Sequence, residues 1–545
     1  MTCPSLPYTV APRADSSAQN VTDLPALLRA YTVYALTSIP ALVDHAPQLL
    51  DVVLKIPLLG SVAQGIVRKT FYEQFVGCET TDDAPPLLLK LRQQNKGVLF
   101  GYSVEVDEKE AGGDKHGVVS VDHAHQQQPV YKQFVDEIIN SIQVAGDFED
   151  SLAGAGIGTG MGRKTMVAAK LSALLPRAQS LNNFSIHLTR TRPALSRPVP
   201  FPGAPSSSDF AVLRNPVPPA GSPLTAEDVK ELKELYDDLD RICTCAKERG
   251  VKVIIDAEHS WYQPAIDAFG LALMEKFNKL PDERGSVTRW LVGSQVEVGN
   301  EVQPLVYATY QAYLRRAPTQ LAHSLALARE KSFALGVKLV RGAYHPRELA
   351  AYASSSSQQG HTLSISPDPY PPVHLTKEDT DACYNACAAL VVRAIADDIH
   401  SSSAQGRSRP PRIGALFGTH NWRSCELVLE ELIKNGLAHP EGSPGVEEEE
   451  VKQPIVVPPE VVERVTFGQL YGMSDSLTNY LVARTKSSTL CVVKYVPYGS
   501  LMEVMPYLSR RAIENKSVLG NGRAARERKE AAVLIWKKVF GGFGI

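Results

Sequence analysis

Short apolar runs recur along the chain, and most are followed by a stretch that can form a helix. Continuous apolar strands that alternate with helices are typical of a parallel sheet covered on both faces. Eight such units favour a closed barrel over an open doubly wound sheet, so the expected fold is an α/β, TIM-like (β/α)8 barrel. The expected strands lie within 98–105, 166–174, 252–260, 305–313, 337–344, 413–421, 465–472 and 490–499.

Between these runs lie segments rich in Gly, Pro, Ser or like charges, with little apolar periodicity. Such segments bury too little surface to order themselves, so we interpret them as long loop insertions in the barrel scaffold. The predicted organisation is a disordered N-terminus at 1–20, an N-terminal helical region at 21–97, the barrel at 98–520 and a helical tail at 521–545. The expected insertions lie near 106–129, 191–224, 353–373, 400–412 and 436–460.

Polar side chains lie in or at the carboxyl ends of the expected strands. In barrel enzymes this end of the sheet carries the active site. Each buried charged or amide group there needs a partner, so a polar residue in nearly every run is more than chance. The residues are Glu105, Lys170, Asp256, Gln311, Lys338, His420, Gln469 and Tyr495.

The charges of the chain nearly cancel, with 57 Lys and Arg against 59 Asp and Glu. No general attraction to nucleic acid is therefore expected. Charged residues such as Arg29, Asp44 and Lys55 interrupt the most apolar region, 24–67. The chain thus lacks a run able to span a bilayer, although association with a membrane surface stays open. The first twenty residues hold one Arg, a poor match to an Arg-rich transit peptide.

Motifs for several other chemistries are missing or misplaced. The glycines of 154–162 give no Gly-x-Gly-x-x-Gly in any register and precede an expected strand, which disfavours a dinucleotide-binding loop. Asp122, His123 and His125 lie in a low-complexity segment without a second ligand pair, so no metal is proposed. No Gly-x-Ser-x-Gly and no Cys placed beside a His occurs. Hydride transfer by a bound cofactor is a chemistry that fits the remaining residues.

One face of an expected helix near the C-terminus gathers charged and aromatic side chains. If 501–515 is helical, Tyr507, Arg510, Arg511 and Glu514 share one face through their i, i+3, i+4, i+7 spacing. Two adjacent Arg beside an aromatic ring can hold a carboxylate by parallel hydrogen bonds and suit a small apolar acid. On this segment alone, a solvated face with an Arg–Glu pair is the alternative.

Five motifs follow one another along the second half of the chain. They are Lys338-Leu-Val-Arg-Gly-Ala-Tyr344, Phe417-Gly-Thr-His-Asn421, Gln469-Leu-Tyr-Gly-Met-Ser-Asp475, Tyr495-Val-Pro-Tyr-Gly499 and Tyr507-Leu-Ser-Arg-Arg-Ala-Ile-Glu-Asn515. In this order they resemble the proline dehydrogenase family, FAD-dependent barrels that oxidise L-proline. The similarity extends loosely from Leu24 to about Asn515, and the Ser-rich insertions resemble the fungal mitochondrial branch of that family.

The resemblance implies a role for each matching position. Arg510 and Arg511 would grip the proline carboxylate, with Lys170 completing the clamp. Lys338 and Gln311 would contact the isoalloxazine ring of FAD, where a cation stabilises the charge that reduction creates. The implied catalytic set is Lys170, Asp256, Tyr495, Arg510 and Arg511. The implied substrate pocket adds Leu339, Ala343, Tyr344, Leu470 and Tyr507, and the further cofactor candidates are Val340, Gly342, Thr419, His420, Asn421 and Glu514.

The reaction implied by the resemblance is hydride transfer from the ring carbon beside a neutral amine to FAD. This would give 1-pyrroline-5-carboxylate, the first step of proline catabolism. Electrons would then pass to a quinone at the matrix side of the mitochondrial inner membrane. Tyr495 matches the proline-specific form of the family, because a hydroxyl on ring carbon four would crowd it.

The sequence departs from the family pattern at three positions. His345 stands where Trp is usual, Gly101 where an acid is common, and Cys78 where Gly is usual. These changes concern packing and flavin access and leave the clamp intact. The alternatives are a hydroxyproline dehydrogenase, another flavin-barrel oxidoreductase and a catalytically silent membrane-surface scaffold.

Overall fold

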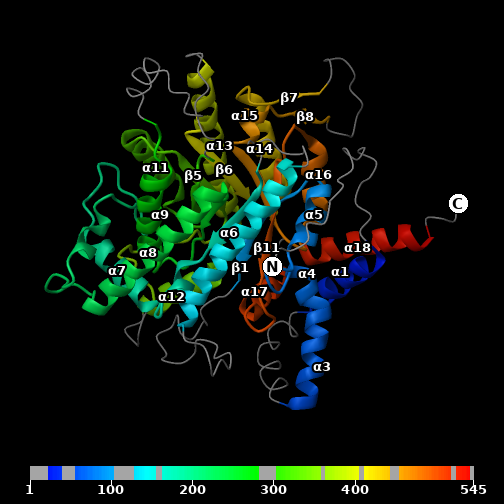
Figure 1. The fold of residues 1–545 in the computed structure, drawn as a ribbon, viewed down its shortest axis with the longest axis horizontal. Coiled ribbons are helices and arrows are strands. Elements are labelled where there is room, and N and C mark those ends of the chain that lie inside the picture. Colours follow the sequence, from blue (N-terminus) through cyan, green and yellow to red (C-terminus); the bar gives the residue numbers. More distant parts are fainter. Residues whose placement is uncertain are drawn as a thin grey trace.

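A closed barrel of parallel strands forms the centre of the molecule (Figure 1). The computed structural model describes residues 23–39, 56–103, 128–154, 163–281, 302–356, 363–403, 410–441, 453–516 and 523–540. The expectations for the N-terminus at 1–20, for Glu105, for the Asp122 to His125 segment and for most of the glycine-rich stretch lie outside the described residues.

The strand order around the barrel is β1–β11–β9–β6–β5–β4–β3–β2, and neighbouring strands pair in parallel. The predicted eight-stranded (β/α)8 architecture is therefore confirmed. The strands are β1 (Gly97–Tyr102), β2 (Thr165–Ala169), β3 (Lys252–Ile255), β4 (Val306–Gln311), β5 (Leu335–Val340), β6 (Ile413–Gly418), β9 (Val465–Leu470) and β11 (Val492–Tyr498). A small separate sheet holds β7 (His439–Pro440), β8 (Ile455–Val456) and β10 (Thr485–Lys486).

Helices surround the barrel and extend from it at the chain ends (Figure 1). Those before the barrel are α1 (Leu24–Thr37), α3 (Pro57–Val67), α4 (Glu73–Phe75) and α5 (Pro85–Gln93). Those between the barrel strands are α6 (Val130–Gly154), α7 (Gln179–Thr191), α8 (Ala226–Arg249), α9 (Gln263–Phe277), α11 (Ala317–Lys331), α12 (His345–Ser356), α13 (Lys377–Ser403), α14 (Trp422–Lys434), α15 (Pro459–Val462) and α16 (Asp475–Arg484). Two helices follow the last strand, α17 (Met505–Lys516) and α18 (Arg523–Phe540).

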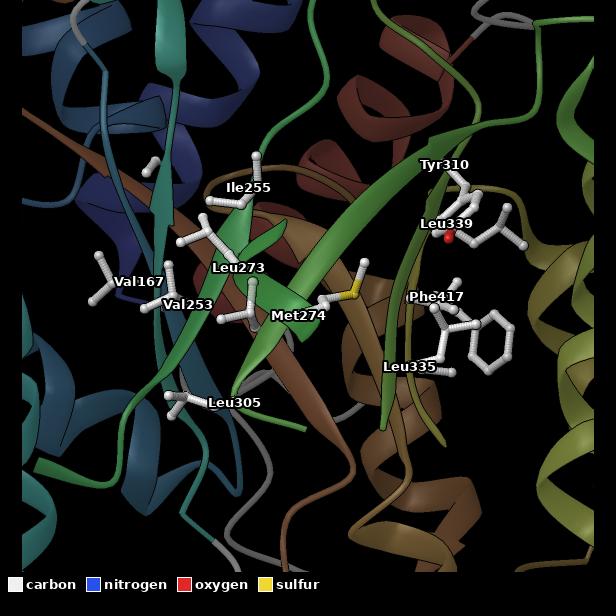
Figure 2. Packing of buried hydrophobic residues seen from close by; sticks show 14 of the residues in the cluster. Val167, Val253, Ile255, Leu273, Met274, Leu305, Tyr310, Leu335, Leu339 and Phe417 are labelled. Atoms are coloured by element: carbon white, nitrogen blue, oxygen red, sulfur yellow. The ribbon is translucent and has the colours of Figure 1, made fainter. Parts of the chain in front are cut away.

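The main hydrophobic core lies between the barrel and its helices. Figure 2 shows Val253 and Ile255 of β3 near Leu273 and Met274 of α9, all buried in one cluster. A second set of apolar side chains forms a separate buried cluster that includes Leu99, Leu416 and Val493. Because strand side chains alternate between the two faces, the first set covers the outside of the barrel and the second fills its interior.

Local sequence fixes where individual helices begin and end. Thr225 accepts a hydrogen bond from the Asp228 N–H (3.1 Å), and Asp228 accepts one from the Thr225 N–H (2.8 Å), so α8 starts with a capping box. The same helix stops at Gly250, whose φ of 62° is left-handed and costs glycine little. These caps fix both ends of the helix that precedes β3.

Two features differ from the sequence-based expectations. The predicted runs extend too far at their carboxyl ends, because β2 stops at Ala169 and Leu171–Leu174 form a 3₁₀ helix. Side chains just beyond the strands, such as Leu171 and Trp261, are still buried, so hydrophobicity continues past the end of the hydrogen-bonded ladder.

The segment 191–224 also packs more firmly than its Pro and Ser content indicates. Phe201 and Leu213 are buried in it. The guanidinium of Arg192 donates to the Asp209 carboxylate at 2.7 Å, and this carboxylate also accepts from the Ser206 N–H at 3.0 Å. The expectation that this insertion could not order itself is wrong, because an ion pair within the segment and a few buried apolar side chains order it.

Helices from opposite ends of the chain support α17. Helices α1 and α18 lie side by side (Figure 1). Val33 and Tyr34 of α1, Ala524 of α18 and Tyr507 and Leu508 of α17 belong to one buried cluster. The terminal helices thus hold α17 in place over one end of the barrel. Within the described residues, no helix is long and apolar enough to cross a membrane.

Candidate active site

A cavity of about 600 Å³ opens at the carboxyl ends of the barrel strands. This volume lies in the range of roughly 300 to 1,000 Å³ that is typical of small-molecule and cofactor sites. Leu99, Leu416 and Val493 from the barrel interior contribute to its lining. Residues from α17 and α18 line the cavity as well.

Asp256, Lys338 and Tyr495 form a hydrogen-bonded group in the cavity. Lys338 Nζ lies 2.5 Å from Asp256 Oδ1, and the Tyr495 hydroxyl donates to Asp256 Oδ2 at 3.3 Å. Lys338 Nζ also lies 5.3 Å from the centre of the Tyr495 ring, within cation–π range. Asp256 directly follows β3, whereas Lys338 lies within β5 and Tyr495 within β11, so the closed barrel is what brings them together.

Helix α17 places its charged and aromatic face on the cavity, as its residue spacing predicts. Arg511 is buried, with Nη2 2.6 Å from Glu514 Oε1 and its guanidinium 4.8 Å from the centre of the Tyr507 ring. The Arg510 guanidinium lies 5.3 Å from the ring of Tyr344. The two guanidiniums therefore face the barrel mouth rather than bulk water, and the solvated-face alternative is wrong.

The loop after β2 brings another cation to the same cavity. Lys170 precedes the 3₁₀ helix Leu171–Leu174, and Ser172 in that helix donates its backbone N–H to Glu258 at 3.0 Å. Burial raises the pKa of Glu258, while the hydrogen bonds from Ser172 oppose this shift. Glu258 follows β3, so it ties the Lys170 loop to the strand that carries Asp256.

Side chains at β4, β5 and β6 form another side of the cavity. The buried Gln311 amide donates to the Glu258 carbonyl at 3.0 Å, whereas its Oε1 has no hydrogen-bond partner among the described residues. Arg341 is fixed by the Asp381 carboxylate (2.6 Å) and by the Thr419 hydroxyl (2.6 Å). His420 Nε2 accepts from the Leu470 N–H at 3.0 Å, so it links the ends of β6 and β9.

These donors and acceptors fit a flavin cofactor. A buried acceptor without a partner, Gln311 Oε1, suits an N–H edge of a flavin ring. Lys338 and Arg341 supply positive charge, which suits a ring that gains charge on reduction and a diphosphate. The small residues Gly342 and Ala343 line the same side.

The structure places the predicted site residues in this one cavity, with a single exception. Leu339 is fully buried on the outer face of the barrel, in the cluster with Tyr310 and Phe417 (Figure 2). Its neighbours Lys338 and Val340 both line the cavity, and alternation along β5 turns Leu339 the other way. The prediction that Leu339 walls the substrate pocket is wrong. The residues in the cavity are Lys170, Asp256, Gln311, Lys338, Val340, Gly342, Ala343, Tyr344, Thr419, His420, Asn421, Leu470, Tyr495, Tyr507, Arg510, Arg511 and Glu514.

Sequence reasoning missed the contribution of α18. Arg526, Glu527 and Glu530 of this helix line the cavity. Ser474 donates its backbone N–H to Glu527 at 2.9 Å, and Ser476 donates its hydroxyl to Glu530 at 2.5 Å. The i, i+1, i+4 spacing of the three charged residues is a signal in the sequence, but α18 lies in the segment expected to be only a helical tail beyond the barrel.

We expect docking of α18 to weaken as the pH rises through about 7. Burial raises the pKa of Glu527 to about 7, and Asp475 and Glu530 act in the same direction against Lys494 and the Ser474 N–H. A carboxyl group whose folded-state pKa is raised stabilises the docked state fully below its unfolded pKa and loses this contribution as the pH rises through the folded value. Protection of α18 amides, corrected for intrinsic exchange, should therefore fall across this window.

The control for this expectation is Glu527→Gln, which keeps the hydrogen-bonding shape and removes the titration. Its α18 protection should be nearly independent of pH between 5 and 8, roughly the window that the raised pKa opens. If α18 protection in Glu527→Gln falls with rising pH as it does in the wild type, a group other than Glu527 governs the helix.

A closed (β/α)8 barrel whose carboxyl end gathers several cations, carboxylates and aromatic rings defines an enzyme site suited to a small anionic molecule. The chain belongs to the proline dehydrogenase family, since the family model described as "Proline dehydrogenase" matches residues 103–524, well over half of it. The predicted membership of this oxidoreductase family is confirmed.

Curated relatives agree with this assignment. Mitochondrial proline dehydrogenase 1 of Dictyostelium discoideum is 26% identical over 494 residues, which cover 90% of this chain and 69% of that protein. The human mitochondrial proline dehydrogenase 1 is 30% identical over 58% of this chain, but the match spans only 40% of the human protein. Hydroxyproline dehydrogenase of Mus musculus is 25% identical over 97% of this chain and 94% of its own length.

A solved structure shares the fold. Proline utilization A from Bdellovibrio bacteriovorus, inactivated by N-propargylglycine, superposes with a TM-score of 0.51 and 18% identity. The match covers 93% of this chain and 39% of the bacterial protein. At this level of identity the likeness supports the barrel fold alone.

Proposed function

We propose that this protein oxidises L-proline to 1-pyrroline-5-carboxylate with FAD as its bound cofactor. The observation that carries the proposal is the convergence of Lys170, Arg510 and Arg511 with the Asp256–Lys338 pair in one cavity of a proline dehydrogenase family member. Bound FAD would supply the hydride acceptor, and Gln311 and Lys338 are the residues best placed to hold its ring.

The cations would bind the carboxylate end of the substrate. Arg511 is held by Glu514 and by the Tyr507 ring, so its guanidinium is ordered before a substrate arrives. A pre-positioned guanidinium can donate two parallel hydrogen bonds to a carboxylate without paying for its own ordering. Lys170 lines the same cavity and would complete the clamp.

The aromatic walls would set the position of the substrate ring. The centre of the Tyr344 ring lies 5.3 Å from the Arg510 guanidinium and 4.1 Å from the ring centre of His259. Tyr495 is held by Asp256. Rings fixed in this way keep water from an apolar substrate and favour one orientation of the carbon beside its nitrogen. The substrate amine must be neutral, so that its lone pair can form the C=N bond as the hydride leaves.

Hydroxyproline oxidation is the second candidate. The similarity to the Mus musculus hydroxyproline dehydrogenase over nearly the whole of both chains favours it. Tyr495 argues for proline, because its ring occupies space that a hydroxyl on ring carbon four would need. The hydrogen bond from the Tyr495 hydroxyl to the Asp256 carboxylate holds this ring in the pocket.

The test is the anaerobic absorption spectrum of the purified protein reconstituted with FAD. Addition of L-proline should bleach the flavin band, and trans-4-hydroxy-L-proline should do so more slowly. Equal or faster bleaching by hydroxyproline would select the second candidate. Protein that acquires no flavin spectrum would support the silent scaffold instead.

We also propose a mitochondrial location on a membrane surface, with a quinone as the electron acceptor. The names of the curated relatives include the word mitochondrial, and this supports the location. The outer half of α18 exposes Leu534, Trp536 and Phe540 beside Lys537 and Lys538. An amphipathic helix with aromatic and basic side chains is suited to an anionic lipid surface. The inner half of the same helix lines the cavity, which supports electron transfer to a lipid-borne acceptor.

The double variant Trp536→Glu/Phe540→Glu should bind anionic vesicles at least about tenfold more weakly, because each buried aromatic side chain contributes on the order of 1.5 to 3 kcal/mol. Co-sedimentation with phosphatidylglycerol vesicles measures this. Val217→Glu, which alters an exposed apolar residue remote from α18, is the matched control. Equal binding of the double variant and the control would refute the role of α18.

A further inference from the structure

The space that Tyr495 occupies exists because residue 101 is a glycine. Gly101 lies near the end of β1, two positions after Leu99, which lines the cavity, so its missing side chain would face the barrel interior. A Cβ at this position would lie 2.2 Å from Tyr495 Oη and 2.4 Å from Cζ. Both separations are far shorter than real contacts of such atoms. The Tyr495 ring therefore rests directly against the backbone of β1.

The same ring also belongs to the polar group of the site. The Tyr495 hydroxyl donates to Asp256 at 3.3 Å, and Lys338 Nζ lies 5.3 Å from the ring centre. The ring position is thus set by two contacts, one with the open backbone surface of β1 and one with the Asp256–Lys338 pair. A side chain at position 101 would displace the hydroxyl end of the ring and with it the hydrogen bond to Asp256.

We propose that Gly101 is a specificity-determining residue, which sets how far Tyr495 reaches into the substrate pocket. This inference rests on the proposed oxidation of a cyclic amino acid. With glycine at 101, the Tyr495 ring can lie against β1, which leaves room for an unsubstituted proline ring but none for a hydroxyl on ring carbon four. Tyr495 stands on β11, which pairs with β1, and its ring lines the cavity, so a larger residue at 101 would push the ring toward the space where the proposed substrate would lie. Residue 101 controls the pocket through Tyr495 and is a positioning residue.

A double-mutant cycle tests this inference. Gly101→Ala should lower kcat/KM for L-proline by at least about tenfold, the effect of overpacking a fixed ring. The loss should be larger for trans-4-hydroxy-L-proline, measured as turnover or as competitive inhibition of proline oxidation. In a Tyr495→Ser background the ring is gone, so adding Gly101→Ala should change kcat/KM by less than about twofold.

A glycine at the other end of the same strand provides the matched control. A Cβ on Gly97 would meet the Lys164 backbone carbonyl at 2.4 Å, outside the cavity. Gly97→Ala should reduce thermal stability without changing the ratio of kcat/KM for the two substrates. Flavin content of each variant, read from its absorption spectrum, separates loss of cofactor from loss of selectivity.

The outcomes distinguish the inference from the function on which it rests. A wild-type protein that oxidises neither substrate would overturn the proposed function and the inference together. An active wild type whose selectivity is unchanged by Gly101→Ala would overturn the inference alone. The inference also fails if Gly101→Ala is equally harmful with Tyr495 and with serine at position 495.

Discussion

Replacing Arg511 by methionine is expected to weaken transition-state binding of L-proline by about 2 to 5 kcal/mol, the usual effect of removing one partner from a desolvated charge pair. This corresponds to a fall in kcat/KM of roughly 30-fold to several thousandfold. The Arg511 guanidinium is buried and already oriented by Glu514 and Tyr507, so little of its interaction with a carboxylate is lost to ordering or to solvent. Steady-state kinetics with proline measures the effect.

Two comparisons make the result specific to the clamp. Arg423→Met removes an exposed Arg–Glu pair on α14 and should leave kcat/KM unchanged, because such surface pairs contribute little. The flavin content of Arg511→Met should match that of the wild type. Arg510→Met should behave as Arg511→Met does. Normal kinetics with proline in either variant would show that the replaced guanidinium does not bind the substrate carboxylate.

The parts of this architecture that sequence could predict are those governed by local pattern. Strands such as β5 and β6 are covered on both faces, so they appear in the sequence as short runs of mostly apolar residues. The Arg510–Arg511 face follows from helical spacing, which places Tyr507 and Glu514 on the same side. The carboxyl-end rule then puts Lys170, Asp256 and Lys338 at one mouth once the barrel is accepted.

The parts that sequence missed depend on contacts between distant segments. No local pattern in the sequence shows that α18 packs at the open end of the barrel, because Glu527 accepts its hydrogen bond from the distant Ser474 N–H. Leu339 was misplaced because a motif does not state which face of the strand each residue occupies. In the sequence, Gly101 is only a departure from the family pattern. Its role becomes visible in the structure, where Tyr495 of β11, almost 400 positions away along the sequence, contacts it.

The Asp256–Lys338 pair combines a structural and a functional role, and these can be separated. Both side chains are nearly buried, with 10% of each exposed, and their charged atoms are 2.5 Å apart. Removal of one member of a buried pair leaves the other charge unpaired and typically costs about 3 to 5 kcal/mol of stability. The cavity admits water, so for Lys338→Met we expect a value near the lower end, about 3 kcal/mol.

The double variant Lys338→Met/Asp256→Asn should recover most of this stability, because no charge is left without a partner and the Tyr495 hydroxyl can still donate to the amide oxygen. Its turnover of proline should stay as low as that of Lys338→Met, since the cation beside the proposed flavin position is gone. Urea unfolding at a fixed FAD concentration and steady-state kinetics give the two halves of the comparison. Recovery of both stability and turnover would mean that Lys338 serves the fold and takes no part in the reaction.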